Sequence, residues 1–218
     1  MSGLSVYVHI PYCVQRCRYC DFTTFEWSQI MPPSRYVDLV LKEIRNRSRP
    51  LVSRPIQTLY FGGGTPSLIE ADLIVAIIQE LANVGFVFAP KCEITLEINP
   101  ATVSKKKMTS YLKAGINRFS VGAQSFDDDL LSICGRKHSA EDTRQTLQML
   151  HDHGVDYNFD LLFALPNQSR EDLQKDLNEV QFWKPSHLSA YCLTVPESHP
   201  MAKGRAPEGE QVQMFRQI

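Results

Sequence analysis

Short apolar runs alternate along the whole chain with longer stretches in which apolar residues recur at helical spacing. The short runs are rich in β-branched and aromatic residues, which favour strands. In the longer stretches, apolar residues recur at i, i+3, i+4 and i+7, as in Ile74, Ile77 and Leu81, which predicts helices with one buried face. The pattern therefore predicts six strand-and-helix units, with strands at residues 4–10, 56–61, 92–98, 117–122, 155–163 and 187–194.

Several helix ends are marked by local sequence signals. Ser139 precedes Asp142, and Ser169 precedes Asp172, in the S-x-x-[DE] pattern that starts helices. Pro185 is expected to end the last helix of the series, because proline cannot continue one. These signals agree with the helices that the apolar spacing predicts.

The alternation of strands and helices predicts an α/β fold with a parallel sheet, because parallel neighbours need a crossover and a helix is the usual one. Six units fit either a wound sheet or an incomplete barrel. In both folds the active site lies at the carboxyl ends of the strands. The unusual sequences of this chain fall at those ends, namely HIPYC, FGGGTP, EINP, GAQSF, DLLFALP and CLTVPESHP.

Length and composition favour one large domain. The chain has 218 residues, of which 43% are hydrophobic, enough for one substantial core. We expect this core to span residues 1–205. An amphipathic pattern begins after Pro207 and stops without a cap, so residues 206–218 are expected to start a C-terminal region that is cut short.

The charges exclude some classes of partner. Lys and Arg number 23 and Asp and Glu 24, a net charge of −1, which offers no electrostatic footprint for nucleic acid. The basic residues 105–107 are predicted to form a solvated helix face. No apolar run is long enough to cross a membrane and no signal peptide is indicated. We therefore expect a cytoplasmic protein whose partner is a small molecule or another protein.

Three of the six cysteines form a CxxxCxxC motif directly after the first predicted strand: Cys13, Cys17 and Cys20. Thiolates suit both iron–sulfur clusters and zinc, and three ligands leave one iron of a 4Fe–4S cluster open. A structural zinc ion wants four protein ligands, and neither a second CxxC nor a spaced Cys/His pair is present. The spacing alone leaves both metals open. The isolated Cys92, Cys134 and Cys192 are expected to be free thiols without a ligand role.

The motifs together resemble a known family. VYVHIPYCVQRCRYCDF resembles the opening of radical SAM proteins of the oxygen-independent coproporphyrinogen III oxidase-like family. The resemblance continues in register through residues 62–66, 97–100, 122–126, 135–136 and 160–166, and so covers essentially the whole chain. It implies an incomplete parallel (β/α)6 barrel of radical SAM type. It also implies a 4Fe–4S cluster on the three cysteines of the motif, with S-adenosylmethionine (SAM) chelating the open iron and accepting one electron at its sulfonium.

Residues at three strand ends are candidates for holding SAM. Glycines let a backbone approach a ligand closely, and the absence of a following GK[ST] makes a phosphate-binding loop a poor interpretation of the glycine run. By resemblance, Gly63, Gly64 and Thr65 line the methionyl amine, while Glu97 and Gln124 bond to ribose hydroxyls. The alternatives are a ligand-free glycine turn and ordinary polar groups at strand ends.

Four further residues are candidates for the same site. The guanidinium of Arg136 suits the methionyl carboxylate, with a surface ion pair as the alternative. Asp160 lies in an apolar run, where an unpaired carboxylate is costly to bury, and a ligand hydroxyl or the adenine would explain it. Tyr7 and Tyr19 are candidates to flank the cofactor, with plain packing as the alternative.

Position 22 separates two branches of the family. The decarboxylating oxidase branch resembles CxxxCxFCxC, and here the place of its further cysteine is taken by Phe22. The run YCDF resembles the haem chaperone branch, which binds haem and passes it on. The resemblance therefore favours a haem chaperone, with SAM, haem or porphyrin, an electron-donor protein and a haem acceptor as partners, and leaves open whether SAM is cleaved. The alternatives are coproporphyrinogen III oxidation and, from another class, a zinc-binding or cluster-free interaction module.

Two stretches depart from the family pattern. FALPNQS at residues 163–169 replaces a glycine-containing YGLPGQT, and PESHP at residues 196–200 replaces an EPGT-like turn. The histidine-containing region that handles haem in this branch is expected to lie beyond Ile218. Haem binding is therefore an expectation for the longer parent protein.

Overall fold

A computed structural model describes residues 3–218, so the first two residues of the predicted core 1–205 lie outside it. The chain forms two compact units, each made of more than one segment. The first unit contains the residues up to Val14, Phe22–Ile98 and Thr102–Phe119, and the second contains Gln15–Asp21, Asn99–Ala101 and Ser120–Ile218.

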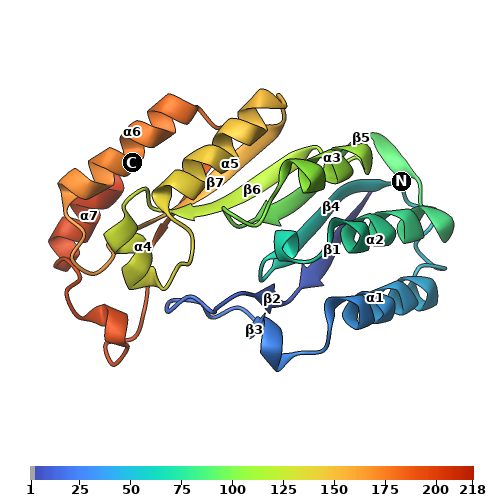
Figure 1. Ribbon diagram of the computed structural model, residues 1–218, viewed down its shortest axis with the longest axis horizontal. Coiled ribbons are helices and arrows are strands. Elements are labelled where there is room, and N and C mark those ends of the chain that lie inside the picture. Colours follow the sequence, from blue (N-terminus) through green and yellow to red (C-terminus); the bar gives the residue numbers. More distant parts are fainter. Residues whose placement is uncertain (1–2) are drawn as a thin grey trace. The chain divides into compact units, whose positions relative to one another are not determined.

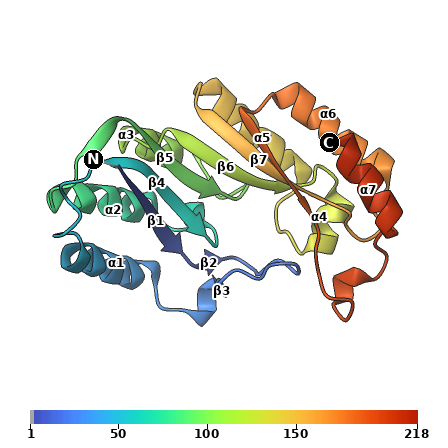
Figure 2. The same ribbon diagram turned by 180° about the vertical axis from the view of Figure 1, so that it is seen from behind.

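The first unit is built on parallel strands in the order β1-β4-β5 (Figure 1). Helices cover one face of these strands, as the front and back views show (Figures 1 and 2). The strands are β1 (Leu4–Ile10), β4 (Ile56–Gly63) and β5 (Phe88–Ile98), with a short parallel pair, β2 (Tyr12–Cys13) and β3 (Phe25–Glu26). The helices are α1 (Pro33–Arg47), α2 (Ala71–Asn83), α3 (Lys105–Lys113) and the 3-10 turns η1 (Trp27–Gln29) and η2 (Pro66–Leu68).

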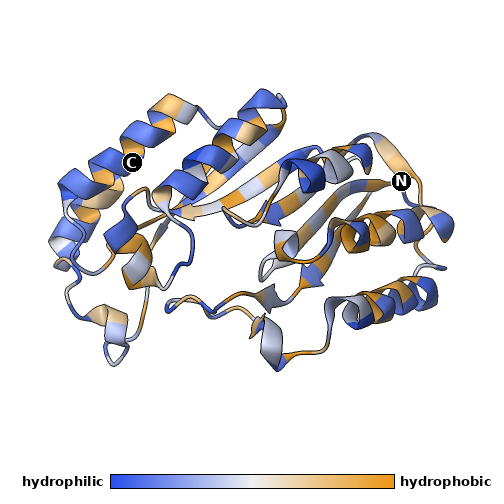
Figure 3. Ribbon diagram, in the orientation of Figure 1, coloured by the Kyte–Doolittle hydropathy of each residue, from blue (hydrophilic) through white to orange (hydrophobic). Residues whose placement is uncertain are grey.

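The core of the first unit lies between these strands and helices. Leu59 and Phe61 of β4 are fully buried, as are Ile74 and Ile77 of α2. Figure 3 shows the same one-sided colouring of α2, with hydrophobic positions on one face and hydrophilic positions on the other. The predicted helical face is therefore the buried face, because it removes apolar surface from water.

The second unit has the strand order β6-β7-β8, and β7 and β8 pair in parallel. The first residues of β6 belong to the first unit and the rest to the second. The strands are β6 (Arg118–Gln124), β7 (Asp156–Phe163) and β8 (His187–Cys192). The helices are α4 (Asp128–Cys134), α5 (Ala140–Asp152), α6 (Arg170–Trp183), α7 (Glu208–Gln217) and the 3-10 turn η3 (Pro200–Ala202).

The predicted strand and helix signals are confirmed. Each of the six predicted strands is a strand within a few residues of its expected bounds. Ser139 with Asp142, and Ser169 with Asp172, form full capping boxes at the starts of α5 and α6. In each box the serine hydroxyl accepts from the aspartate amide, and the aspartate carboxylate accepts from the serine amide. The helix α6 ends at Trp183, and its C-cap, Lys184, directly precedes the proline.

Residues 206–218 pack on the second unit. Met214 of α7 is 1% exposed and lies in a cluster with Phe163, Leu173 and Leu177. Such burial removes most of the methionine side chain from water. The domain boundary after residue 205 stays a prediction.

The departure from the family pattern at residues 163–169 has a backbone consequence. Ala164 has a φ of 56° and Asn167 a φ of 61°, at the two positions where the family pattern carries glycine. This left-handed region disfavours residues with a Cβ by about 1–2 kcal/mol, although asparagine tolerates it better. The turn after β7 thus keeps a left-handed backbone without its glycines.

Candidate cofactor-binding site

The glycine run in the first unit is fastened to the segment that leads to Cys13. The Gly64 amide donates to the Ile10 carbonyl (2.8 Å), and the Thr65 amide donates to the Tyr12 carbonyl (2.7 Å). A Cβ at Gly64 would lie 2.6 Å from that same Tyr12 oxygen, closer than real side chains come. Glycine is therefore required at position 64 by close backbone approach.

Two residues predicted separately, Gly63 and Glu97, lie together. One oxygen of the Glu97 carboxylate accepts from the Gly63 amide (3.0 Å), and the other accepts from the Tyr60 hydroxyl (2.8 Å). Hydrogen bonds to an ionised carboxylate are stronger than neutral ones. Glu97 therefore holds the glycine loop in place, and Tyr60 is a partner of Glu97 that the sequence analysis missed. The alternation of side chains along a strand is the signal that could have found it, because Tyr60 and Glu97 lie on neighbouring strands.

Tyr7 lies on the exposed side of β1. Its side chain is 58% exposed, which makes plain packing a poor explanation, and its ring stacks at 6.1 Å on Tyr60. The Tyr7 hydroxyl is hydrogen-bonded to Nδ1 of His9 (2.9 Å), and Nε2 of His9 to the Thr23 carbonyl (2.8 Å). His9 thus connects the end of β1 to the segment after the cysteine motif.

The prediction that residues 105–107 form a solvated face is wrong for Lys107. Its ammonium donates to the carbonyls of Ser67 (2.6 Å), Leu68 (3.3 Å) and Thr102 (3.2 Å). Burial lowers the pKa of Lys107, because a charged form is disfavoured away from water. The lysine therefore fastens the turn that follows the glycine run.

The three cysteines of the motif are half-buried free thiols. Cys13 ends β2 in the first unit, whereas Cys17 and Cys20 belong to the second. The Cys20 amide donates to the Cys17 carbonyl (3.1 Å), which turns the loop back on itself. Within residues 3–218, no three His, Cys, Asp or Glu side chains form a ready-made metal site.

The isolated cysteines differ among themselves. Cys92 and Cys134 are buried, whereas Cys192 is exposed. Burial raises the pKa of the Cys134 thiol to about 12, so Cys134 is a protonated, unreactive side chain near neutral pH. Cys192 is the last residue of the edge strand β8.

Arg136 lies among polar groups of the second unit. Its terminal nitrogens donate to the Asn99 side-chain oxygen (2.9 Å), the Gly122 carbonyl (2.6 Å) and the Cys17 sulfur (3.4 Å). Its Nε is buried and has no hydrogen-bond partner among the described residues. Two residues predicted separately, Arg136 and Cys17, thus lie together, and Asn99 is a contact that the sequence analysis missed.

Tyr19 packs beside the same group of residues. Its ring contacts the apolar cluster that contains Leu130 and Cys134. Burial raises the pKa of Tyr19 well above its ordinary value, against the opposing effect of Arg136. Tyr19 is therefore an uncharged side chain with one face in the core.

The other two predicted residues of the second unit lie at strand positions. Asp160 is half-buried and accepts from the Asn158 amide group (3.4 Å). Gln124 is 8% exposed and has a φ of 69°, a left-handed conformation that is strained for a residue with a Cβ. Gln124 is thus a buried strand end with an unusual backbone, not an ordinary surface group.

Two buried titratable groups near Gln124 were missed by the sequence analysis. Burial raises the pKa of Asp176 to about 6, although hydrogen bonds from Phe126 and Ser125 lower it. Burial, with the charge of Arg136, lowers the pKa of His138 to about 4. Neither residue belongs to a recognisable motif, so the sequence carried no signal for them.

Comparison with known proteins defines the class of protein to which this geometry belongs. The family model described as the Radical SAM superfamily matches residues 7–180. The chain therefore belongs to the radical SAM superfamily, a family that implies a 4Fe–4S cluster and SAM. The predicted family and the α/β fold of radical SAM type are confirmed.

Among curated proteins, this chain is similar to heme chaperones. The protein named "Heme chaperone HemW" from Haemophilus influenzae is 37% identical over 213 residues, which cover 95% of this chain and 55% of that protein. The protein of the same name from Escherichia coli is 35% identical over 208 residues, which cover 95% of this chain and 54% of that protein. The chain spans about half the length of the curated relatives it matches.

A solved structure is similar over nearly the whole chain. Coproporphyrinogen III oxidase (HemN) from Escherichia coli, described as a radical SAM enzyme, matches with a TM-score of 0.90 and 25% identity. The match covers 99% of this chain and 51% of that chain.

Among the described residues, no helix is long and apolar enough to cross a membrane.

Proposed function

We propose that this chain holds a 4Fe–4S cluster on Cys13, Cys17 and Cys20, binds SAM at that cluster, and serves in haem transfer as the core of a haem chaperone. The observation that carries the proposal is that residues predicted separately from different motifs are hydrogen-bonded in pairs. Gly63 is bonded to Glu97, and Cys17 to Arg136. Within each unit, two motifs that the resemblance assigns to cofactor binding are thus joined by a hydrogen bond, which supports a binding role over unrelated surface features.

The donor groups fit the two cofactors. Half-exposed thiols can reach a cluster, and thiolate is the ligand that iron–sulfur clusters prefer. The close contact of Gly64 with the Tyr12 carbonyl holds the glycine run against the segment that leads to Cys13, so the two motifs are kept together. The guanidinium of Arg136 retains a buried, unpaired Nε, a donor suited to a carboxylate.

The roles of the residues follow from their chemistry. When bound, the reduced cluster supplies one electron to the sulfonium of SAM. Gly63, Gly64 and Thr65 offer backbone to the methionyl amine, and Glu97 holds that loop. Gln124 serves the ribose hydroxyls. The remaining proposed contacts are Arg136 for the methionyl carboxylate, Asp160 for a hydroxyl or the adenine, and Tyr7 and Tyr19 beside the cofactor.

Haem transfer is favoured over porphyrinogen oxidation by one position and by the relatives. Phe22 is 71% exposed and takes the place of the further cysteine of the oxidase pattern. The two curated relatives described above are named heme chaperones. A haem acceptor, an electron-donor protein and a cytoplasmic location are parts of the same proposal.

The test is anaerobic reconstitution with iron and sulfide, followed by electron paramagnetic resonance of the reduced protein with and without SAM. We expect about four iron and four sulfide per chain, for one 4Fe–4S cluster, and a signal that SAM changes. The Cys17→Ala variant should lose the cluster, whereas the matched Cys192→Ala variant should keep it. One zinc and no sulfide would instead support the interaction module.

Haem binding and porphyrinogen oxidation are separated by two further measurements. Haem is titrated into the reconstituted protein and followed by absorption, with Cys192→Ala as a control for haem bound adventitiously by an exposed thiol. Coproporphyrinogen III is incubated anaerobically with SAM and reductant, and the products are analysed. Haem binding without decarboxylated product supports the chaperone, and decarboxylated product supports the oxidase.

A further inference from the structure

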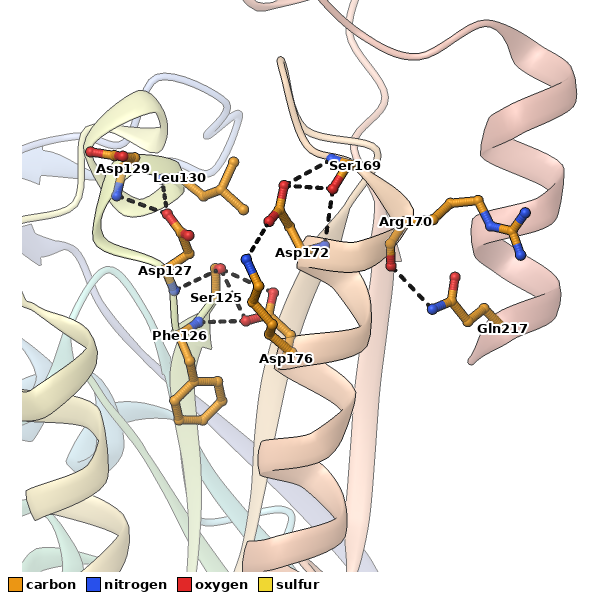
Figure 4. Close-up of polar contacts among 11 residues, drawn as sticks. Ser125, Phe126, Asp127, Asp129, Leu130, Ser169, Arg170, Asp172, Asp176 and Gln217 are labelled. Carbon is orange, nitrogen blue, oxygen red and sulfur yellow. Dashed lines mark hydrogen bonds and ion pairs between the residues drawn. The ribbon is translucent and has the colours of Figure 1, made fainter.

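A buried carboxylate on α6 holds the turn that follows β6. Asp176 is 1% exposed. Its oxygens accept from the Ser125 hydroxyl, at 3.1 and 3.0 Å, and from the Phe126 amide, at 2.7 Å (Figure 4). Burying a carboxylate is unfavourable unless hydrogen bonds compensate it. Among residues 3–218, the donors to this buried carboxylate all come from the one turn, which suggests that the turn must be held.

The turn begins at a strained residue. Gln124 directly precedes Ser125 and Phe126 and has the left-handed φ of 69°. Such a conformation persists only where the surrounding structure over-determines it. The bonds from Asp176 act on the two residues that follow Gln124, so they fix the backbone that aims its side chain.

The same network continues into α4. The Ser125 hydroxyl oxygen accepts from the Asp127 amide (3.1 Å). The Asp127 carboxylate in turn caps α4 by accepting from the amides of Asp129 (2.9 Å) and Leu130 (3.1 Å) (Figure 4). The helix ends at Cys134, and its C-cap, Gly135, directly precedes Arg136. Through the Ser125 hydroxyl, the hydrogen bonds of Asp176 are thus connected to the cap of α4.

We propose that Asp176 is a positioning residue for SAM binding, which acts by holding the Ser125–Phe126 turn so that Gln124 keeps its left-handed backbone. This inference rests on the proposed function, in which Gln124 contacts the ribose. Asp176 itself is buried and bonds to Ser125 and Phe126, neither of which is a proposed SAM contact.

The test is a double-mutant cycle on SAM affinity, measured with the anaerobically reconstituted chain. Asp176→Ala removes the acceptor for two donors, and we expect SAM to bind about tenfold more weakly. Gln124→Ala should weaken SAM binding as well. The double variant should bind SAM as tightly as Gln124→Ala alone, because both substitutions remove the same interaction, the contact of Gln124 with SAM. Additive losses, or an Asp176→Ala variant that binds like the wild type, would overturn the proposal.

Rescue separates positioning from loss of fold. Asp176→Asn keeps an oxygen that accepts from Phe126, so its SAM affinity should stay within about threefold of the wild type, a difference of under 1 kcal/mol. Glu171→Ala, an exposed position on the same helix, is the matched control. Weak binding by both the alanine and asparagine variants, each with a thermal stability no lower than that of the wild type, would contradict a role that depends on the hydrogen bonds.

A measurement without cofactors separates this proposal from the proposed function. Hydrogen–deuterium exchange of the cofactor-free chain should show faster exchange at the Phe126 amide in Asp176→Ala, but not in Glu171→Ala. If the wild type binds no SAM, the proposed function fails, and the exchange result alone decides whether Asp176 positions this turn. Unchanged exchange in Asp176→Ala would overturn the positioning role in either case.

Discussion

Replacing Asp176 with asparagine is expected to stabilise the fold at neutral pH, although it removes a hydrogen-bonded carboxylate. Burial raises the pKa of this carboxyl from 3.8 to about 6, beyond the opposing effects of Phe126 and Ser125. The folded state therefore binds the proton more tightly than the unfolded state. The contribution of this group to the free energy of unfolding is therefore largest at pH values below its pKa in the unfolded state. It is lost as the pH rises through the pKa in the folded state.

The magnitude follows from the two pKa values. The difference between 3.8 and about 6 corresponds to roughly 3 kcal/mol of lost stability at neutral pH. Asparagine resembles the protonated carboxyl in charge, so the Asp176→Asn variant avoids this loss. We expect the free energy of unfolding to rise by about 1–3 kcal/mol at pH 7.5 and to match the wild type near pH 4. Urea unfolding followed by circular dichroism at both pH values measures the difference.

A second carboxylate on the same helix provides a control of opposite sign. Hydrogen bonds from Lys175 and Ser169 lower the pKa of Asp172 to about 2. Asp172→Asn should therefore destabilise the fold at pH 7.5, by about 1 kcal/mol for a weakened cap, and the difference should shrink as pH falls from about 4 to 2. If Asp176→Asn is instead less stable than the wild type at pH 7.5, the argument from burial of the carboxylate is refuted.

Three further predictions concern the glycine loop and the helix caps. Gly64→Ala should weaken SAM binding and lower stability by about 1–3 kcal/mol, because its Cβ would meet the Tyr12 carbonyl at 2.6 Å. In the matched control, Gly209→Ala, nothing lies within 4 Å of the added Cβ, so SAM affinity should stay unchanged. Lys107→Met should lower the free energy of unfolding, measured in urea, by about 1–3 kcal/mol, because three carbonyls lose their donor. The control, Lys106→Met at an exposed position, should change it by no more than about 0.5 kcal/mol. Ser139→Ala removes the cap of α5 and should lower the free energy of unfolding by about 1 kcal/mol, and an unchanged value would argue against the capping box.

The sequence by itself was enough to predict the order of strands and helices. The first strand was predicted with its observed bounds, Leu4–Ile10, because the apolar spacing that marks a strand is a property of adjacent residues. The capping boxes at Ser139 and Ser169 were predictable for the same reason, since each one joins residues three apart. The motifs also named the candidate residues of the site, including Gly63, Glu97 and Arg136.

Only the tertiary structure decided how those residues are held. Glu97 accepts a hydrogen bond from Gly63, and Asp176 accepts one from Ser125, although many residues separate the partners in the sequence. Lys107 was expected on a solvated helix face, but its ammonium donates to three carbonyls. A parallel sheet joins strands through crossovers, so its neighbours come from distant parts of the chain. The local pattern therefore tells where a polar side chain starts, but the fold determines which distant donor or acceptor compensates its burial.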